Sequence, residues 1–280
     1  MAKIISFTNQ KGGVGKTTTC VNLSAYLAVL GQRVLMIDLD PQGNATSGVG
    51  VEKRKGLNTI NELINGEKTF NEVVIETQIE GLDVIPSTVD LAAAEVALVS
   101  MPQREKVMKK ILEEVENRYD FIMIDCSPSL GLLTINALTA SNSVIIPMQC
   151  EFYALDGLTQ LMNTIRLVKF HLNPNLDVEG VVRTMKDNRS NLINQVSQEI
   201  IKFFKNKVFD TYIPRNIRLA EAPSHGLPIV LYDPSSKGAE AYLSLAEEFL
   251  NRNKIKFTPF TKSTKIKLRN GGDEQWLKKV

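Results

Sequence analysis

The sequence predicts a three-layer α/β fold, in which a mostly parallel, twisted sheet is flanked by helices on both faces. Short apolar runs rich in β-branched residues alternate along the chain with longer segments of helical periodicity. Most of these short runs are continuously apolar, as expected of strands that are buried on both sides. The 280 residues include 43% apolar and 23% charged residues, a composition that is ordinary for a globular protein and excludes disordered and fibrous classes.

Seven segments are expected to form strands and six to form helices. The expected strands are Ile4–Thr8, Val34–Leu39, Leu82–Pro86, Phe121–Asp125, Ser143–Pro147, Val178–Thr184 and Val208–Ile213. The expected helices are Thr17–Leu30, Arg104–Asn117, Leu132–Ala140, Leu155–His171, Leu192–Phe204 and Gly238–Asn251. Gly31 follows the first helix where a left-handed glycine commonly ends a helix.

The composition also limits where the protein works. No segment approaches the ~18 uninterrupted apolar residues that a membrane-spanning helix needs, and no long apolar stretch follows Lys3, so we expect a cytoplasmic protein. The cysteines at positions 20, 126 and 150 are widely spaced and form no CxxC pair. We therefore expect buried free thiols, not disulfides or a four-cysteine metal site.

The net charge of +2 hides an uneven distribution along the chain. Residues 251–280 contain nine basic and two acidic residues, a net charge of +7, which leaves −5 for residues 1–250. We therefore expect one domain, residues 1–251, followed by a basic tail, residues 252–280. Because this tail lacks the pattern of a regular amphipathic helix, we expect it to be flexible and solvated; the alternative is an auxiliary contact with nucleic acid or anionic lipid.

The strongest motif lies between the first expected strand and the first expected helix. It consists of Lys11, Gly12, Gly13, Val14, Gly15, Lys16, Thr17 and Thr18. Its glycines allow backbone N–H groups to surround an anion, and the helix N-terminus adds partial positive charge. Lys16 would reach the outer phosphates of a nucleotide, and the Thr17 hydroxyl would ligate Mg²⁺. The common phosphate-loop pattern has glycine at the position of Gln10, whereas this chain has the additional Lys11.

This loop resembles the deviant Walker A motif of the ParA/MinD superfamily of ATPases, in which the extra lysine contacts the nucleotide of a partner subunit. Three further segments make the resemblance specific to ParA/Soj-type ATPases that partition chromosomes or plasmids. They are VLMIDLDPQGN from Val34, IMIDCSPS from Ile122, and IPRN from Ile213 with LAEAP shortly after it. The resemblance covers residues 3–251 and implies a P-loop NTPase fold that binds ATP and Mg²⁺ and hydrolyses ATP.

Three aspartates lie at the ends of expected strands. Asp38 and Asp40 end the second strand, at the edge where α/β sheets present ligand-binding groups. The resemblance assigns Asp40 to positioning or activating the attacking water, and Asp38 to the outer shell of the metal. Asp125 fits the Walker B role of holding Mg²⁺, directly or through water. The family more often has proline where Ser127 stands, a departure that affects loop rigidity more than chemistry.

Hydrolysis of ATP transfers a phosphoryl group to water, so no serine, cysteine or histidine nucleophile is required. The residues expected to act in it are Lys11, Lys16 and Asp40. Because the resemblance implies that Lys11 acts across an interface, each site is expected to be complete only in a homodimer that sandwiches two ATP molecules. Hydrolysis would then act as a timer on the lifetime of the dimer.

The resemblance also points to residues for the adenine base. These are Pro214 and Asn216, with Met185 or Asp187 nearby. The IPRN segment could equally form a turn that holds the edge of the sheet, so both interpretations stay open.

The resemblance further implies binding of double-stranded DNA without sequence preference once ATP has dimerised the protein, and hence association with the nucleoid. Such binding needs basic residues on one face of the dimer and depends strongly on salt. Arg189 and Arg218 match family positions with this role, and Lys186 and Lys205 are plausible neighbours. Taken alone, each arginine could be a solvated surface group. A ParB/Spo0J-like centromere-binding protein is expected to stimulate hydrolysis.

Four other classes of protein are alternatives to a partitioning ATPase. A MinD-like membrane switch needs a basic amphipathic C-terminal helix, but Glu240, Glu247 and Glu248 would be repelled by anionic lipid, so no stable membrane association is expected. Iron proteins with this loop bridge a cluster through two cysteines of each subunit, and only Cys150 is loosely placed for that role. A metabolic synthetase explains neither DPQGN nor IPRN. A non-enzymatic scaffold would leave the lysines and aspartates of these motifs without a role.

Overall fold

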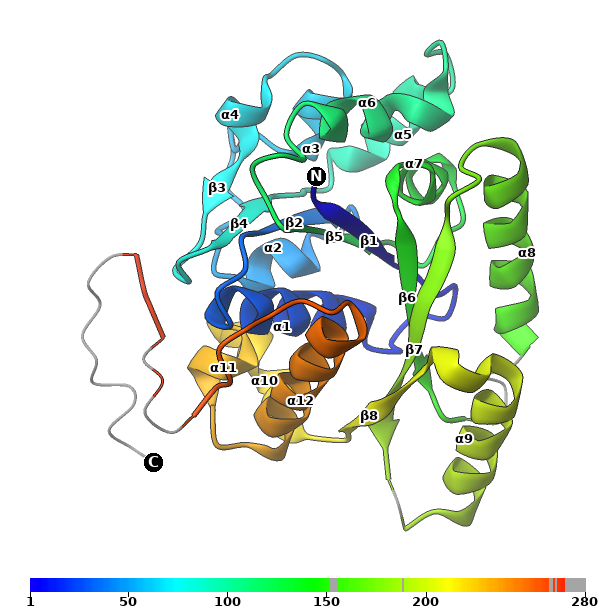
Figure 1. Ribbon diagram of the computed structural model, residues 1–280. Helices are drawn as coiled ribbons and strands as arrows, with labels where there is room; N and C mark the ends of the chain where they lie inside the picture. The colour runs from blue at the N-terminus through cyan, green and yellow to red at the C-terminus, as the bar shows by residue number, and fades with distance from the viewer. Residues whose placement is uncertain (152–155, 188, 262–263, 265, 270–280) are drawn as a thin grey trace.

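The computed structural model of the protein describes residues 1–151, 156–187, 189–261, 264 and 266–269. Within these residues, eight strands form a sheet in the order β3-β4-β2-β5-β1-β6-β7-β8. Every neighbouring pair is parallel except β3 and β4. Helices cover both faces of this sheet (Figure 1). The predicted three-layer α/β architecture is therefore confirmed.

All seven expected strands are present, with small differences at their ends. The strands are β1 (Lys3–Phe7), β2 (Val34–Leu39), β3 (Ile75–Glu76), β4 (Leu82–Ile85), β5 (Phe121–Cys126), β6 (Ser143–Gln149), β7 (Asp177–Lys186) and β8 (Val208–Pro214). β3 was not expected because a strand of two residues is too short to produce a periodic pattern.

The helices include all six that the sequence predicts, although Leu155, the expected first residue of the fourth, lies outside the described residues. They are α1 (Lys16–Val29), α2 (Asn44–Gly48), α3 (Ile60–Ile64), α4 (Phe70–Val73), α5 (Leu91–Leu98), α6 (Val107–Glu113), α7 (Leu132–Ala140), α8 (Asp156–His171), α9 (Asn191–Phe204), α10 (Ile217–Glu221), α11 (Ile229–Tyr232) and α12 (Lys237–Arg252). α6 is shorter than expected because Arg104–Lys106 forms a 3-10 helix before it. The additional helices have four to eight residues, too few for a clear period.

Two of these short helices carry a start signal that the sequence does contain. α3 and α4 each begin with a capping box, in which a threonine and the glutamate three residues later satisfy each other's backbone N–H groups. The pairs are Thr59 with Glu62 and Thr69 with Glu72. The Thr-x-x-Glu spacing could therefore have located both helices.

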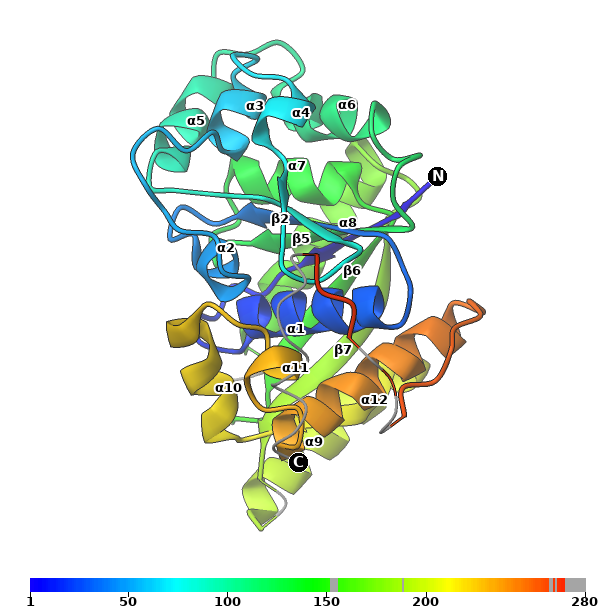
Figure 2. The same cartoon turned by 90° about the vertical axis from the view of Figure 1, so that its left-hand side faces the viewer.

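Successive residues of each central strand pack into different cores. In β2, the fully buried Leu35 and Ile37 pack on one face, whereas the fully buried Met36 packs on the other. One face is covered by α1, α10, α11 and α12, and the opposite face by α3 to α7 and, over β6 and β7, by α8 and α9 (Figure 2). Because neither face meets solvent, the strands have continuous apolar sequences.

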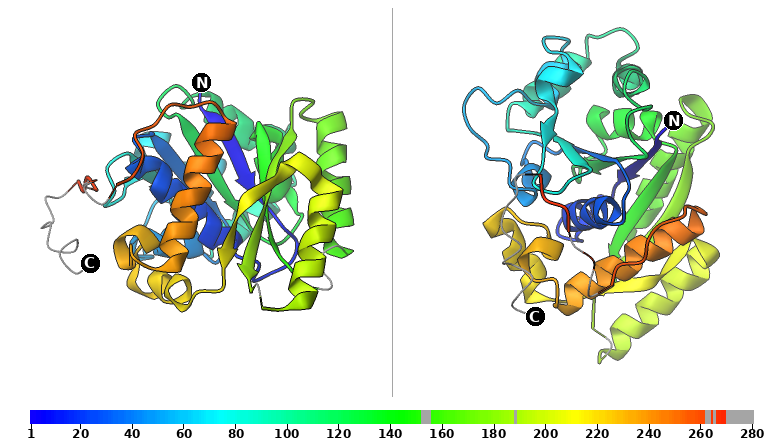
Figure 3. Two further views of the ribbon diagram at one scale, coloured as in Figure 1. Left: turned by 60° about the horizontal axis from the view of Figure 1, so that its bottom comes forward. Right: turned by 60° about the vertical axis from the view of Figure 1, so that its left-hand side comes forward.

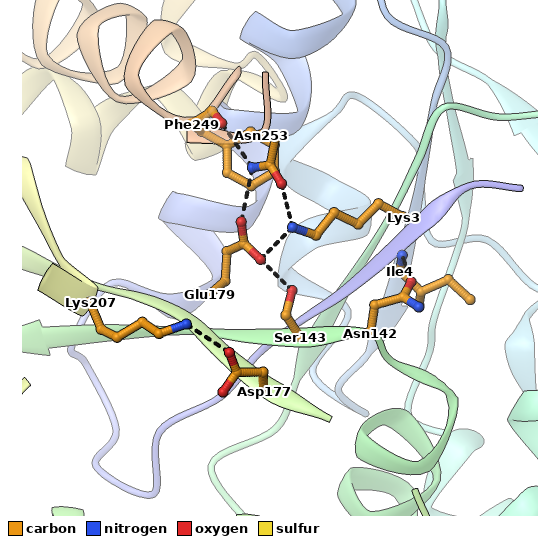
Figure 4. A network of polar contacts seen from close by, with 9 residues as sticks. All are labelled: Lys3, Ile4, Asn142, Ser143, Asp177, Glu179, Lys207, Phe249 and Asn253. Carbon is orange, nitrogen blue, oxygen red and sulfur yellow. Dashed lines mark hydrogen bonds and ion pairs between the residues drawn. The ribbon is translucent and has the colours of Figure 1, made fainter. Parts of the chain in front are cut away.

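A polar network joins the amino-terminal ends of three strands to the end of α12 (Figure 4). Glu179 of β7 pairs with the ammonium group of Lys3 at 2.6 Å and accepts a hydrogen bond from Ser143 at 2.6 Å. Asn253, directly after α12, donates to the same carboxylate at 2.9 Å. Burial acts to raise the pKa of Glu179, but these three contacts hold that pKa below its ordinary value. The network therefore fixes the sheet at the end opposite to the phosphate loop.

The described residues after α12 run past α1 toward the far edge of the sheet (Figure 3). Phe260 meets Tyr26 of α1 edge-on, with ring centroids 6.5 Å apart. Further on, Leu268 forms an antiparallel bridge with Ile79, just before β4. This part of the basic segment thus packs against the domain, while residues 270–280 lie outside the described residues, and the expected flexibility of the segment stays a prediction.

Candidate nucleotide-binding site

The loop between β1 and α1 is shaped by its glycines and by a neighbouring strand. Gly13 and Gly15 have φ values of 73° and 82°, in the left-handed region that favours glycine. The hydroxyl of Thr184, near the end of β7, donates to the carbonyl of Val14 at 2.8 Å. The sequence did not indicate this contact, because Thr184 is separated from the loop by most of the chain.

Lys16 begins α1 and is only 6% exposed. Its ammonium group donates to the carbonyl of Lys11 at 3.3 Å. Burial lowers the pKa of Lys16, while the negative charges of Asp125 and Asp40 act in the opposite direction. A buried ammonium group held by a long hydrogen bond to a carbonyl is well suited to binding a phosphate. The phosphate would compensate for the loss of water around the ammonium group.

Asp125 of β5 is completely buried, and neither of its carboxylate oxygens has a hydrogen-bond partner among the described residues. Burial raises the pKa of Asp125 well above its ordinary value and the charge of Asp38 adds to this effect, while the nearby Thr17 hydroxyl opposes it. A buried carboxylate without a partner is unfavourable unless a cation binds to it. A carboxylate beside a hydroxyl is the all-oxygen donor set that Mg²⁺ prefers, so these residues fit the metal.

Asp38 stands opposite Asp125 in the paired strands β2 and β5. Its carboxylate accepts hydrogen bonds from the backbone N–H and the hydroxyl of Thr46, both at 2.7 Å, and from the N–H of Asp40 at 3.2 Å. Burial nevertheless raises the pKa of Asp38 to about 6. Two buried carboxyl groups with raised pKa values therefore lie on adjacent strands at the edge where the phosphate loop lies, and a bound cation would favour their ionised forms.

Asp40 sits in the tight turn that follows β2. Its carboxylate accepts the N–H of Gln42 at 2.9 Å, and its carbonyl accepts the hydroxyl of Ser87 at 2.8 Å. Gly43 has a φ of 61°, and a Cβ at that position would lie 2.6 Å from the Ser87 carbonyl oxygen. The DPQGN turn therefore requires glycine, and it holds Asp40 close enough to Lys16 for the two charges to interact.

Lys11 is held by its own chain in this structure. Its ammonium group pairs with Glu151, shortly after β6, at 2.5 Å, and the two side chains are 40% and 46% exposed. A pair this exposed contributes about 1 kcal/mol or less, so Lys11 can leave it readily. Glu151 was not predicted, although an acidic residue after a strand is the same signal that pointed to Asp38 and Asp40.

The residues expected near the adenine lie at the ends of two adjacent strands. Lys186 of β7 stands in register with Pro214 of β8, next to Met185. The side-chain oxygen of Asn216 accepts the N–H of Arg218 at 2.8 Å and so begins α10. IPRN thus forms a strand end and a helix cap, and its contact with the adenine stays a prediction.

The two arginines expected to contact DNA follow these same strands. The side chain of Arg189 is 90% exposed and makes two hydrogen bonds to Asp187, at 3.0 and 2.7 Å. Arg218 pairs with Glu221 at 3.0 Å and with Asp233 at 3.2 Å. Both arginines are therefore engaged by carboxylates of their own chain, and their contact with DNA stays a prediction.

The three cysteines are buried free thiols, as expected. Cys20 lies within α1, Cys126 ends β5, and Cys150 follows β6. Burial raises the pKa of each thiol. Protonated, enclosed thiols of this kind pack as small apolar groups and do not present ligands at a subunit surface.

The fold and the site together define a P-loop protein that binds a nucleoside triphosphate. A family model described as an AAA domain matches residues 2–178. The chain is 59% identical over 248 residues to the sporulation initiation inhibitor protein Soj of Bacillus subtilis, covering 89% of this chain and 98% of that protein. It is 50% identical over 253 residues to the chromosome partitioning protein ParA of Myxococcus xanthus, covering 90% of this chain and 89% of that protein. The chain therefore belongs to the ParA/Soj family of partitioning ATPases, which confirms the resemblance carried by its motifs.

A solved relative shows what such a site binds. The structure of cobyrinic acid a,c-diamide synthase from Mycobacterium smegmatis, with bound ATP analog and magnesium, aligns with a TM-score of 0.80 and 35% identity. The alignment covers 93% of this chain and 100% of that one. The fold of this chain is thus shared with an enzyme whose structure holds an ATP analog and magnesium.

Proposed function

We propose that this chain is an ATP-hydrolysing switch that segregates a chromosome or plasmid, acting on nonspecific DNA as an ATP-dependent dimer. Its membership of the ParA/Soj family supports the ATPase activity and the partitioning role. The observation that carries the proposal is the buried, unpartnered carboxylate of Asp125, in register with Asp38 and beside the phosphate loop. That arrangement is unfavourable in the empty protein and becomes favourable when a metal nucleotide binds.

The residues of the loop have distinct roles in this proposal. The backbone N–H groups of residues 12–18 would hold the phosphates, and Lys16 would neutralise their charge. Thr17 and Asp125 would hold Mg²⁺, with Asp38 in its outer shell, and the metal would supply charge neutralisation on the phosphate oxygens. Asp40, fixed by its turn, would orient the attacking water.

Lys11 would complete the site of a second copy of the chain. Its side chain is 40% exposed and is held only by a half-exposed partner, so it is available to exchange Glu151 for the nucleotide of the other subunit. Each site is then whole only in the dimer, and hydrolysis sets the lifetime of that dimer.

DNA binding would use Arg189 and Arg218, which follow the carboxyl ends of the adjacent strands β7 and β8. Contacts from arginine to phosphate carry no information about base sequence, so a dimer that binds through them would associate with the nucleoid in the cytoplasm. A ParB/Spo0J-like centromere-binding protein would stimulate hydrolysis and so release the dimer from DNA.

The membrane alternative is not favoured by the contacts of α12. Leu245, Phe249 and Leu250 are fully buried against α1 and the sheet, so the apolar side of this helix is already occupied. Among the described residues, no helix has the length and apolarity needed to cross a membrane.

The ATPase and dimer steps are tested with three lysine variants and one aspartate variant. Lys16→Ala should abolish ATP binding and dimerisation, and Lys11→Ala should bind ATP without dimerising. Asp40→Ala should remain a dimer with uncleaved ATP, and Lys68→Ala, two residues before α4, should behave as wild type. Phosphate release and light scattering measure these outcomes. Hydrolysis by Asp40→Ala at the wild-type rate would refute the role of Asp40.

The DNA step is tested by binding to a random-sequence duplex with ATP, with ADP and without nucleotide, at low and high salt. Binding should require ATP, weaken with salt, and be strongly weakened, but still measurable at low salt, in Arg189→Ala and Arg218→Ala. Absence of binding by an ATP-dependent dimer would reject the DNA role and direct the next experiment to anionic liposomes.

A further inference from the structure

We infer that Glu221 and Asp233 hold Arg218 in an intramolecular clamp that competes with DNA phosphate for this arginine. The inference rests on the proposed binding of DNA and adds a device that sets its strength. The clamp comprises Arg218, Glu221, Tyr232 and Asp233, which come from α10, from the end of α11 and from the residue after it.

The clamp contacts two different nitrogens of the guanidinium group. Nη1 of Arg218 lies 3.0 Å from Oε2 of Glu221, one turn further along α10. Nε of Arg218 lies 3.2 Å from Oδ2 of Asp233, the residue directly after α11. Because the two carboxylates come from different elements, the arginine is fixed by tertiary packing and not only by a local helical pair.

Glu221 is itself held in position. The hydroxyl of Tyr232 donates to the same Oε2 atom at 3.1 Å, and the Tyr232 ring stacks on His225 with centroids 4.9 Å apart and planes at 29°. The hydrogen bonds from Arg218 and Tyr232 hold the pKa of Glu221 below its ordinary value. The carboxylate is therefore ionised at neutral pH and is already oriented toward the arginine.

The charges of the clamp oppose the approach of a phosphate. One guanidinium group faces two carboxylates, which leaves a local charge of −1 among these three groups. A DNA phosphate must displace the carboxylates from Arg218 and come close to them as it does so. Like charges placed side by side are unfavourable, so the clamp lowers affinity both by competition and by repulsion.

The second arginine lacks such a clamp. Among the residues that the structure describes, Arg189 pairs with Asp187 alone, and its side chain is 90% exposed, so solvent and salt screen the interaction. The side chain of Arg218 is 50% exposed, and those of Glu221 and Asp233 are 37% and 27% exposed. The stronger restraint is therefore expected at Arg218.

The test removes each negative charge while keeping the size of the side chain. Asp233→Asn and Glu221→Gln are each expected to tighten duplex binding by roughly two- to fivefold, and the double variant by about tenfold, because partly exposed ion pairs of this kind are weak. Binding is measured with the full chain, Mg²⁺ and ATP on a random-sequence duplex, with dimerisation followed in the same samples.

A matched control separates the clamp from a general effect of charge. Glu105→Gln removes the same charge and breaks the ion pair with Arg104, which Glu105 contacts at 2.9 Å. This pair lies just before α6, at the opposite end of the molecule from α10 (Figure 1). Each clamp variant is also combined with Arg218→Ala, because only residues that act through one another give non-additive effects.

Tightening that disappears in the Arg218→Ala background and is absent in Glu105→Gln would support the clamp, as would binding that appears only in the clamp variants. Equal tightening in both backgrounds would overturn it in favour of a general charge effect. If wild type binds DNA and the clamp variants bind no more tightly, the clamp is wrong while the DNA function stands. If neither wild type nor any variant binds as an ATP dimer, the proposed DNA function fails, and the clamp with it.

Discussion

Replacing Asp38 by asparagine should change how the stability of the nucleotide-free protein depends on pH. Asp38 is buried, and its pKa is raised from 3.8 to about 6. Because the folded protein holds this proton more tightly than the unfolded chain does, the stabilising effect is fully present below pH ~4 and is lost as the pH rises through ~6. The Asp38→Asn variant has no such proton and should not show this loss.

The size of the effect follows from the two pKa values. A difference of about two pKa units at ~1.4 kcal/mol each corresponds to roughly 3 kcal/mol. Asparagine keeps an acceptor for Thr46 but loses the bond from the N–H of Asp40, which costs about 1 kcal/mol at every pH. We therefore expect the variant to be the less stable protein at pH ~4 and the more stable one, by about 2 kcal/mol, above pH ~7.

The assay is thermal unfolding followed by circular dichroism between pH ~4 and ~8, with EDTA and without nucleotide. EDTA is needed because Mg²⁺ would neutralise the charge that causes the effect. Across this range the Tm difference between variant and wild type should change by about 6–12 °C. Asp90→Asn, at an exposed aspartate before α5, serves as the control and should give a constant difference. Parallel curves for Asp38→Asn and wild type would refute the reasoning.

Three further changes test contacts that hold the sheet and the phosphate loop. Gly180→Ala would place a Cβ 2.4 Å from the ring of Phe209 and should cost roughly 1–3 kcal/mol in urea unfolding; an unchanged midpoint would show that the ring can move freely. Glu179→Ala leaves Lys3 without its partner at 2.6 Å and should cost roughly 2–3 kcal/mol in the same assay, whereas Glu179→Gln should cost less. Thr184→Val removes the hydrogen bond to the phosphate loop and should weaken ATP binding about fivefold by calorimetry, while Thr184→Ser should restore it; equal affinity of both variants would contradict a role for the hydroxyl.

The features that the sequence predicted correctly are local ones. The seven main strands were found because burial on both faces leaves a continuous apolar run, and the six main helices because burial of one stripe leaves a helical period. The loop from Lys11 to Thr18 was found because its strand, glycines, lysine and helix follow one another directly. Elements of two to eight residues were missed because so few residues do not display a clear period.

The C-terminal segment shows that net charge alone does not predict whether a segment packs against the domain. A net charge of +7 over residues 251–280 predicted a solvated tail. In the structure, however, Ile255, Phe257 and Phe260 pack against the core beside α1 while the lysines at 254 and 256 are exposed. The net charge depends on the charged side chains, which remain exposed to water. Whether the segment packs against the domain depends on the apolar side chains that lie between them.

The sequence by itself determined the fold class, the phosphate loop and the aspartates at the strand ends, because each is written in a short stretch of chain. Only the tertiary structure decided that Asp38 stands opposite Asp125, that Thr184 holds the loop, that Glu151 holds Lys11, and that two carboxylates hold Arg218. Most of these contacts join residues on different elements, brought together by strand order and helix packing. The free energy that selects such an arrangement comes from burial of the whole core, so no local pattern in the sequence records it.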